Sequence, residues 1–519
     1  MFQVLDVMIS VFQSKGDEKL EIPLHHSAFP SPPKRDSTLP PAEKHSLIKR
    51  ITRMRREKSE MYSLWCDCLY KLSIANHLRD RIFWLPHNLD FRGRVYSVPP
   101  HLQHLGGDLS RGLLLFAVAK PLGPDGLQWL KTHLVNLTGL KKHSSMEERI
   151  AFADEMMPQI LDSADRPLDG ERWWTQSDDP WQTLACCKEI AAASRSPDPR
   201  AFQSRFPVHQ DGSCNGLQHY AALGRDQHGA ESVNLVPFER PQDVYTEVAN
   251  LVEKERENDA RNGVAVAQCL EGFVKRKVVK RTVMTFVYGV TRYGARLQIL
   301  KELRDMDDFP KEMEWLASAY LMFQVFASIE RMFTATREIQ DWLTECASVL
   351  SKSLSQPVKW VTPLGFPVTQ PYYKQAPSGG SELRQSVRGV VLSPNSRKQK
   401  NGFPPNFIHS LDSTHMMLTA LRCEAERLAF VSVHDCYWTH ASDVPTMNRI
   451  CRQQFLALHS QPILSDLADS FVAQYAHQLK EVAVKSPESY KKMLHVLSRA
   501  PKTGSLRLDQ VLDSVYFFS

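Results

Sequence analysis

Hydrophobic positions recur at helical spacing over most of this 519-residue chain. Apolar residues three and four positions apart predict a helix over residues 1–14 that ends near Gly16. A Pro- and Ser-rich stretch at 22–41 predicts a linker, and helical periodicity returns over 42–84 and 108–195. The first part of the chain is therefore predicted to be helical apart from this linker.

The rest of the chain contains two departures from the helical pattern. Residues 86–100 predict a loop that leads into a short strand, and residues 356–405 show a β-like, turn-rich pattern that predicts an extended hairpin. Elsewhere the helical pattern dominates, because no proline interrupts residues 242–309 and the periodicity continues over 315–355, about 409–428 and most of the last 80 residues. The pattern predicts an α+β fold that is mostly α-helical.

Two aspartates lie where an apolar or β-branched run gives way to turn-prone residues. Asp211 follows residues 206–208 and opens the motif Asp-Gly-Ser-Cys-Asn-Gly, whereas Asp435 follows residues 430–433. Such a carboxylate is expected at the end of a strand or in a tight turn. Either aspartate alone is better explained as a turn or capping residue. Together, two carboxylates from distant segments could hold a pair of Mg²⁺ ions over a phosphate, because hard cations prefer oxygen ligands.

A basic helix is predicted between the two aspartates. Arg276, Lys280, Met284 and Tyr288 step by four residues and are expected to stack along one face, with apolar residues supplying the packing face. A triphosphate lying along this helix would meet Arg and Lys at its phosphates and Tyr at its sugar and base. A basic amphipathic surface helix is the simpler alternative. Against this alternative, five cations fall within residues 275–281, and their mutual repulsion is costly unless a bound anion neutralises it.

Composition and charge narrow the class of protein. Hydrophobic residues make up 42% and charged residues 24%, as in an ordinary soluble globular protein, and the length suggests about three or four lobes. The formal charge of +6 favours polyanionic partners where it is concentrated in a cleft. The ten cysteines show no CxxC pair and no zinc spacing, which predicts free thiols in a reducing compartment. No apolar run reaches the ~18–20 residues of a membrane span.

Two metal-binding carboxylates and a Lys/Arg/Tyr helix for a triphosphate form a nucleotidyl-transferase constellation. Five motifs in order and spacing carry a resemblance: Asp-Phe-Arg-Gly-Arg at 90–94, the Asp211 motif at 211–218, the helix through Lys280 and Tyr288-Gly289, Pro-Asn-Phe-Ile-His-Ser at 405–410, and Val-His-Asp at 433–435. On these motifs, and over nearly its whole length, the chain resembles the single-subunit, bacteriophage-type DNA-directed RNA polymerases, and most closely their mitochondrial branch.

The resemblance implies a right-hand polymerase fold with a small antiparallel palm sheet. A specificity hairpin that reads promoter DNA is expected within the fingers, at about 360–402. The implied divisions are a thumb at 1–84 with the linker at 22–41, first palm segments at 85–226 with a helical insertion at 120–205, fingers at 227–408, and a second palm segment with a C-terminal helical region at 409–519.

The resemblance also implies roles for individual residues. Asp211 and Asp435 match the catalytic palm aspartates that bind metal, with the Gly212 carbonyl assisting, so two Mg²⁺ ions are the expected cofactors. Lys280 matches a catalytic lysine and Arg276 matches a phosphate contact.

Further positions match residues that select the nucleotide or bind nucleic acid. Tyr288 matches the residue that gates ribose and checks the incoming nucleotide, with His409 assisting near the minor groove. In DNA polymerases of related architecture a glutamate five positions after the first catalytic Asp blocks the 2′-hydroxyl, whereas Gly216 here leaves room for ribose. The tail at 517–519 resembles an aromatic tail packed near the active site. The predicted nucleic-acid contacts are Arg94, Arg111, Arg281 and His434.

The function implied is template-directed addition of rNTPs to an RNA 3′-end by two-metal nucleotidyl transfer in mitochondrial transcription. The implied partners are template DNA, nascent RNA, rNTPs and mitochondrial initiation and elongation factors, with no membrane contact and a monomeric state. Family members carry an N-terminal promoter-binding region, whereas this sequence starts at the thumb. Residues 1–15 contain no arginine and match an organelle presequence poorly. The resemblance thus predicts a mitochondrial-matrix catalytic core that does not find promoters alone.

Three other functions stay open on the residues themselves. A DNA polymerase of the same architecture is disfavoured by Gly216. A metal phosphohydrolase built on His434 and Asp435 needs further His or Asp ligands at suitable spacing, and it leaves the basic helix without a role. A truncated, catalytically impaired nucleic-acid-binding isoform is disfavoured because both aspartates and Lys280 are intact.

Overall fold

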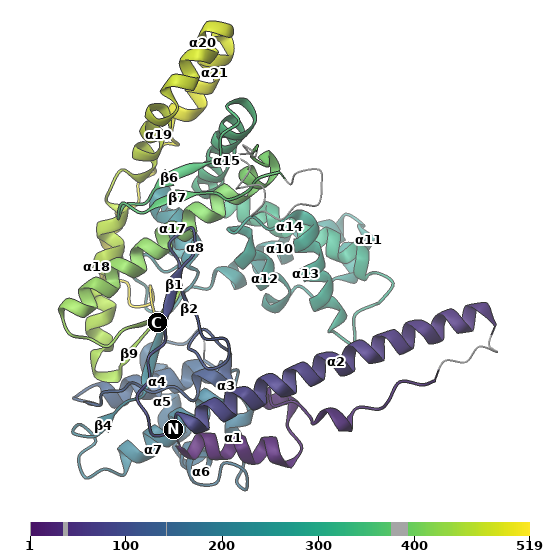
Figure 1. Cartoon of the computed structure of the whole chain (residues 1–519), viewed down its shortest axis with the longest axis vertical. Helices are drawn as coiled ribbons and strands as arrows, with labels where there is room; N and C mark the ends of the chain where they lie inside the picture. The colour runs from purple at the N-terminus through teal and green to yellow at the C-terminus, as the bar shows by residue number, and fades with distance from the viewer. Residues whose placement is uncertain (1, 35–39, 142, 375–392) are drawn as a thin grey trace, which may run out of the picture.

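The computed structural model describes residues 2–34, 40–141, 143–374 and 393–519. Helices account for most of the structure, and the strands form small antiparallel sheets of two or three strands (Figure 1). The predicted α+β, mostly helical class is therefore confirmed. Within these ranges, no helix is both long and apolar enough to cross a lipid bilayer.

The N-terminal part of the chain forms the helical lobe at the base of Figure 1. α1 (Phe2–Ser14) ends as predicted at Gly16, whose φ of 77° lies in the left-handed region that favours glycine. α1 packs with α2 (Pro41–His77) around a hydrophobic cluster that includes Leu5 and Trp181. The lobe also contains α3 (Asp108–Arg111), β3 (Lys120–Pro121), α4 (Gly126–Thr138), α5 (Met146–Glu155), α6 (Met157–Asp165), α7 (Pro180–Ser194) and β4 (Gln203–Ser204).

The prediction of helix up to residue 84 was wrong at its C-terminal end, because α2 ends at His77. Leu78 and Phe83 are half-buried and pack in the same hydrophobic cluster as Leu5 of α1, which favours a turn here over further helix. The chain then passes through Trp84, which is 83% exposed. Contacts with a distant helix decide this boundary, and they are not visible in local periodicity.

Residues 86–100 form two paired strands instead of the single strand predicted. β1 (His87–Leu89) pairs with β2 (Val95–Ser97), and the motif at 90–94 makes the connecting loop. Asp90 Oδ1 accepts hydrogen bonds from the backbone N–H groups of Arg92 at 2.8 Å and Arg94 at 3.0 Å. Gly93 has a φ of 92°, so the turn needs a residue without a Cβ at that position.

The central sheet joins the two segments that carry the predicted aspartates. β5 (Pro207–Asp211) pairs with β9 (Cys436–His440), and β9 pairs with β8 (Val431–Val433), all antiparallel. The register sets Cys436 opposite both Asp211 and Val433. Asp211 therefore ends a strand and Asp435 lies in a two-residue hairpin loop, as the sequence pattern predicted.

A second lobe of helices follows the central sheet along the chain; α10–α14 lie toward the right of Figure 1, whereas α8 and α15 lie beside α17 (Ser396–Ala425). Its helices contribute Val283 of α12 and Ile329 of α14 to the largest hydrophobic cluster of the described residues, which continues into residues 403–518. The elements are α8 (Asn215–Gly224), α9 (Gln227–Ser232), α10 (Val244–Arg261), α11 (Ala265–Cys269), α12 (Arg276–Phe286), α13 (Arg292–Arg304), α14 (Glu314–Met332), α15 (Thr334–Ser348) and the π-helical turn Val349–Ser353.

The β-like pattern at 356–405 holds for only part of that range. β6 (Lys359–Val361) and β7 (Pro367–Thr369) form a hairpin, but α17 (Ser396–Ala425) starts far earlier than the predicted helix at 409–428. Residues 375–392 of the expected specificity hairpin lie outside the described residues. The helix continues through Pro404 and Pro405 although prolines normally end a helix.

A buried glutamine near β7 accounts for this continuous helix. Gln370 Nε2 donates to the carbonyl of Gln399 at 3.0 Å, and Gln370 Oε1 accepts from Asn406 Nδ2 at 2.8 Å. These bonds bridge the helix across its proline pair. They come from a strand that is distant along the chain, so the sequence pattern could not reveal them.

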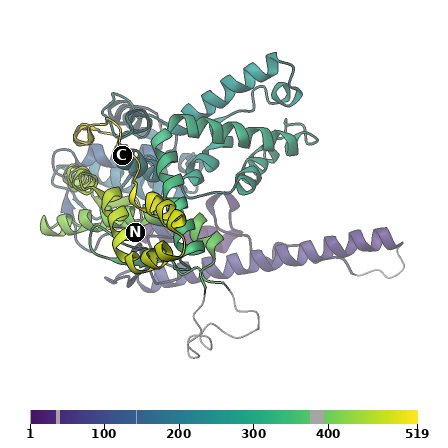
Figure 2. The ribbon, with the colours of Figure 1, turned by 90° about the horizontal axis from the view of Figure 1, so that it is seen from above.

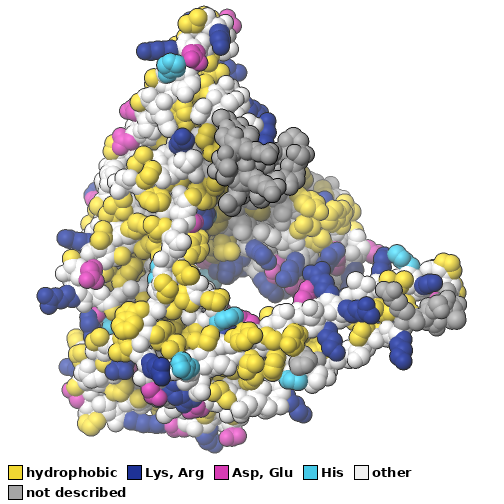
Figure 3. All heavy atoms as spheres, in the orientation of Figure 1, with side chains coloured by type: hydrophobic (Ala, Val, Ile, Leu, Met, Phe, Trp, Pro, Cys, Tyr) yellow, Lys and Arg dark blue, Asp and Glu magenta, His cyan; other side chains and the backbone are white. Residues whose placement is uncertain are grey.

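The chain ends with α18 (Val444–His459), α19 (Ile463–Gln474), α20 (Ala476–Lys485) and α21 (Pro487–Ser498), which confirms the predicted helical C-terminal region. The last residues then return to the central sheet (Figure 1). α2 projects from the body of the molecule in both ribbon views (Figure 2). Figure 3 shows a hollow between α2 and the second lobe, with Lys and Arg side chains gathered on the α12 and α13 side.

Candidate active site

Asp211 and Asp435 lie next to each other at one end of the central sheet. The backbone N–H of Gly212 donates to the carbonyl of Asp435 at 3.3 Å, which ties the two segments together. In the hairpin loop, His434 has a φ of 57°, a backbone conformation that is strained in most residues and that is often found at functional sites. The structure thus brings together two carboxylates that are far apart in the sequence.

Both carboxylates have raised pKa values. Burial raises the pKa of Asp435 to about 8, and the negative charges of Asp211 and Asp412 add to this shift. The carboxylate of Asp211 is open to solvent but closely surrounded by protein atoms, and this desolvation raises its pKa to about 6 against the opposing charges of Arg111 and Lys280. A bound cation would relieve the repulsion between the two groups.

The atoms gathered here suit a hard divalent cation. The donors are the two carboxylates and the predicted carbonyl of Gly212, the residue after Asp211 at the end of β5, so every donor is an oxygen. In the described part of the chain, no three His, Cys, Asp or Glu side chains form a metal cluster. Mg²⁺ commonly binds through one or two carboxylates and completes its shell with water and substrate phosphates, so this donor set fits Mg²⁺.

The C-terminal tail packs directly against the first aspartate. The N–H of Ser519 donates to the carbonyl of Asp211 at 3.1 Å, and Phe518 forms a backbone bridge with Gly212. The Phe518 ring stacks on Tyr437 with ring centroids 5.1 Å apart. The tail is therefore placed beside the candidate site, where the resemblance expected it.

α12 brings basic side chains to the same region. Arg276 donates through Nε to Asp243 Oδ2 at 2.7 Å, and its guanidinium lies 5.1 Å from the centroid of the Tyr245 ring. Lys280 Nζ lies 5.9 Å from the same centroid, and its charge reaches Asp211. Arg281 is exposed and makes no ion pair within the described residues.

The predicted series of four-residue steps runs past the end of the helix. α12 ends at Phe286, so Tyr288 lies just beyond it, in a turn where its N–H donates to the carbonyl of Thr285 at 3.1 Å. This turn carries Tyr288 toward Asp435 and Asp412, and burial, followed by the negative charges of these two residues, raises the pKa of Tyr288. The glycine that follows at 289 has a φ of 73° and allows the turn.

Gly216 is in contact with Tyr288. A Cβ at position 216 would lie 2.7 Å from Val287 Cγ2 and 3.3 Å from the Tyr288 hydroxyl. Gly216 belongs to α8 and is buried. Any larger side chain here must displace the turn after α12. The position of Tyr288 therefore depends on the glycine at position 216.

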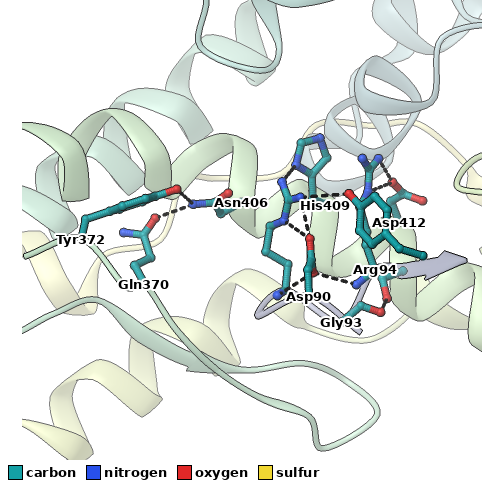
Figure 4. A network of polar contacts seen from close by, with 11 residues as sticks. Asp90, Gly93, Arg94, Gln370, Tyr372, Asn406, His409 and Asp412 are labelled. Atoms are coloured by element: carbon teal, nitrogen blue, oxygen red, sulfur yellow. Dashed lines mark hydrogen bonds and ion pairs between the residues drawn. The ribbon is translucent and has the colours of Figure 1, made fainter. Parts of the chain in front are cut away.

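His409 lies against the other face of the tyrosine. The ring centroids of Tyr288 and His409 are 4.7 Å apart, and Arg92 Nη1 lies 2.6 Å from His409 Nδ1. Arg92 is in turn bound by Asp90 Oδ2, at 2.8 Å from Nε and 2.6 Å from Nη2 (Figure 4). Sequence reasoning named His409 but assigned no role to Asp90 or Arg92, although both lie in a quoted motif.

Arg94, a predicted nucleic-acid contact, forms an ion pair with Asp412 of α17. Asp412 is 2% exposed and accepts from Arg94 Nε at 3.0 Å (Figure 4). Ser413 donates to the carbonyl of Gly93 beside this pair. Asp412 was missed by sequence reasoning; its only signal is its position three residues after His409, on the same face of a helix.

The remaining predicted contacts surround the sheet. Arg111 donates through Nε to the carbonyl of His104 at 3.1 Å, and its guanidinium lies 5.8 Å from the centroid of the Trp438 ring. The His434 ring meets Tyr96 edge-on at 4.8 Å, and burial lowers the pKa of His434. The structure thus gathers the predicted site residues around the two aspartates and the turn that follows α12, except for the exposed Arg281 and for Arg276, which pairs with Asp243 at the start of α12.

The sequence of this chain is similar to the sequences of known proteins over nearly its whole length. The chain is 57% identical over 99% of its length to "DNA-directed RNA polymerase, mitochondrial" of Mus musculus and covers 43% of it. It is 55% identical over 100% of its length to the Homo sapiens protein of that name and covers 42% of it. It is 45% identical over 92% of its length to "DNA-directed RNA polymerase 2, chloroplastic/mitochondrial" of Arabidopsis thaliana and covers 47% of it.

The chain therefore spans less than half the length of these relatives. The family described as DNA-dependent RNA polymerase matches residues 120–519, which contain both aspartates, the turn after α12 and the C-terminal tail. Since this match covers most of the chain and the identities extend beyond it to the N-terminal lobe, the chain belongs to the DNA-dependent RNA polymerase family.

Proposed function

We propose that this chain is the catalytic core of a DNA-directed RNA polymerase, which adds rNTPs to an RNA 3′-end opposite a DNA template. The observation that carries the proposal is the convergence of Asp211 and Asp435 at one sheet end, with Lys280 close enough to lower the pKa of Asp211. A phosphohydrolase would use the two carboxylates but not the basic helix and the turn beyond it.

The carboxylates of Asp211 and Asp435, with the Gly212 carbonyl, would hold two Mg²⁺ ions. When bound, these ions supply activation of the RNA 3′-hydroxyl and neutralise charge on the leaving pyrophosphate. Lys280 offers positive charge, or a proton, to the pyrophosphate oxygen, and Arg276 binds the phosphates from one helical turn away.

The sugar is selected where Gly216 meets Tyr288. Because Gly216 has no side chain, Tyr288 approaches α8 closely, and a ribose 2′-hydroxyl can be accommodated where a glutamate would block it. His409 packs on Tyr288 and completes the nucleotide site near the minor groove. These contacts favour RNA synthesis over DNA synthesis.

The arrangement of lobes supports a right hand. Residues 1–84, which contain the projecting α2, serve as the thumb, and residues 85–226 and 409–519 supply the palm with the central sheet. Residues 227–408 serve as the fingers and carry α12. Arg94, Arg111, Arg281 and His434 are proposed contacts to template and RNA.

The working environment is proposed from the relatives. The Mus musculus and Homo sapiens proteins are named mitochondrial, so we assign this chain to mitochondrial transcription in the matrix, acting as a monomer. Its partners are template DNA, nascent RNA and rNTPs, together with transcription initiation and elongation factors. The specificity hairpin at about 360–402 would read promoter DNA.

Extension of a preassembled RNA:DNA scaffold tests the proposal because this assay needs no promoter opening. The chain should add rNTPs in Mg²⁺ and prefer them to dNTPs. Asp435→Asn removes one of two metal-binding carboxylates and should reduce the extension rate by about 10³-fold or more, while scaffold affinity changes little.

Glu426→Gln, an exposed carboxylate that pairs with Arg449, is a matched control and should leave extension unchanged. Near-normal extension by Asp435→Asn would refute the two-metal assignment. Scaffold binding without any extension by the unmodified chain would support the alternative function, a catalytically impaired nucleic-acid-binding isoform.

A further inference from the structure

The contact between Arg92 and His409 determines where the imidazole carries its proton. Arg92 Nη1 lies 2.6 Å from His409 Nδ1. A guanidinium has only N–H donors and stays protonated, so Nδ1 must accept this hydrogen bond. A neutral imidazole carries a single proton, which is then on Nε2.

Arg92 cannot easily turn away from this contact. Asp90 Oδ2 accepts from its Nε at 2.8 Å and from its Nη2 at 2.6 Å, and Nη2 also lies 3.3 Å from the Tyr96 hydroxyl. Asp90 is itself fixed by two backbone N–H groups of the loop at 90–94. The guanidinium is therefore held on three sides, and its remaining nitrogen points at the imidazole.

His409 Nε2 remains available to a ligand. The ring borders a cavity of about 470 Å³ that is also lined by Tyr288, Arg92 and Asn406. No protein group among the described residues forms a hydrogen bond with Nε2. Burial, with the charges of Arg94 and Arg92, lowers the pKa of His409 to about 2, so the ring stays neutral.

We propose that Arg92 is a positioning residue that holds His409 in its neutral, Nε2-protonated tautomer, so that the nucleotide cavity presents a hydrogen-bond donor to an acceptor atom on the minor-groove edge of the nucleotide. This inference rests on the proposed polymerase function. Purines carry the acceptor N3 and pyrimidines the acceptor O2 at this edge, so a donor there reads pair geometry without reading sequence. The opposite tautomer would present a lone pair to these acceptors, and only the N2 amino group of guanine could donate to it.

The test uses the full chain and single-nucleotide extension of a preassembled scaffold. Its probe is 3-deaza-ATP, in which C–H replaces the N3 acceptor. The unmodified chain should prefer ATP by about tenfold in kcat/KM, the value of one good hydrogen bond. Arg92→Met should lose most of this preference, and Arg92→Lys, which also donates only, should restore it.

A second background separates tautomer control from a structural role. In His409→Gln the amide nitrogen occupies the place of Nε2 and donates without help from Arg92. Adding Arg92→Met to His409→Gln should then change the preference for ATP by less than twofold. An equal loss in both backgrounds would overturn the proposal, because Arg92 would act through something other than the imidazole.

Two further measurements identify the acceptor and the tautomer. If Arg92→Met altered the ratio of ATP to 2′-deoxy-ATP incorporation and left the 3-deaza-ATP ratio unchanged, a ribose oxygen would be the acceptor and the base-edge assignment would be wrong. Nitrogen NMR of [¹⁵N]histidine-labelled protein, with the His409 signal assigned from His409→Gln, should show an unprotonated Nδ1 and a protonated Nε2. A protonated Nδ1 would overturn the inference even in a chain without polymerase activity.

Discussion

At the scale of single residues, the candidate site brings together carboxylates whose negative charges repel one another. Asp435 has a pKa raised to about 8 because it is buried beside Asp211 and Asp412. Asp412 is already neutralised by Arg94, whereas the two sheet aspartates have no such direct partner among the described residues. This difference explains why we assign metal binding to Asp211 and Asp435 and a supporting role to Asp412.

The raised pKa values predict a pH-dependent response to Mg²⁺. An unfolded Asp has a pKa of 3.8 and folded Asp435 about 8, so the metal-free fold loses stability as pH rises from about 4 to 8. Mg²⁺ needs the ionised carboxylates and must displace protons at lower pH. Mg²⁺ should therefore raise the thermal midpoint more at pH 8.5 than at pH 6.5, as measured by calorimetry.

Asp435→Asn provides the control for this pH effect, since it removes the group with the largest shift. Its midpoint should respond weakly to Mg²⁺ at both pH values. An equal response of the unmodified chain at pH 6.5 and 8.5 would contradict the assignment of the raised pKa to the metal site.

The contact between Gly216 and Val287 predicts a steric effect on catalysis. In Gly216→Ala the new Cβ meets Val287 Cγ2 at 2.7 Å, so the turn that carries Tyr288 must shift. Displacements of this size in a reacting site are expected to lower kcat/KM for rNTP addition by about ten- to a hundredfold. Single-nucleotide extension measures this loss directly.

Val287→Ala supplies a matched test of the cause, because it removes the methyl group that would collide. The double variant Gly216→Ala/Val287→Ala should recover most of the lost kcat/KM. Failure of this recovery would show that the glycine is needed for a reason other than the approach of the turn.

At the scale of elements, α17 positions much of the site and depends on bonds from outside the helix. It carries His409 and Asp412 on one face, one turn beyond its two prolines. The buried Gln370 bridges the helix across those prolines through Gln399 and Asn406. The geometry of the nucleotide cavity therefore relies on a strand connection next to β7.

Gln370→Ala should lower the free energy of unfolding of this region by about 1–3 kcal/mol, because Gln399 and Asn406 of α17 each lose a buried hydrogen bond. The thermal midpoint should fall, and extension should become more sensitive to temperature. Gln268→Ala is the matched control, since Gln268 is exposed and forms a single bond to the Ala260 carbonyl. A similar change in midpoint for both variants would argue against a bridging role for Gln370.

At the scale of the whole molecule, α2 and α12 line opposite sides of the hollow in Figure 3. α2 carries a run of exposed cations that includes Lys49 and Arg50. Positive charge on both sides of a hollow favours a nucleic acid held between them. This arrangement supports the proposed thumb at residues 1–84.

Replacing Lys49 and Arg50 with Gln should weaken scaffold binding and flatten its salt dependence. Each lost phosphate contact lowers the slope of log K against log salt by about 0.7–0.9. Titration of a fluorescent scaffold at several salt concentrations measures both quantities. Lys491→Gln/Lys492→Gln on α21 keeps the same change in net charge and should alter neither, which separates local contact from general charge.

Local sequence determined where many of the helices, strand ends and turns of this protein lie. Apolar runs followed by turn residues located Asp211 at a strand end and Asp435 in a turn, because strand ends and turns depend on neighbouring residues. Helical spacing likewise gave α1, α10 and α12. The five motifs predicted the polymerase family, and the similarity to known polymerases confirms it.

Only the tertiary structure decided which residues meet. The sequence did not reveal that Arg92 binds His409, that Asp412 binds Arg94, or that α17 continues through Pro404 and Pro405. Each of these features depends on groups far apart along the chain. Local propensity does not predict the two contacts, and it predicts that the prolines end the helix. Hydrophobic periodicity specifies faces and lengths of elements, whereas buried polar partners are specified by packing, and in this site the packing sets the chemistry.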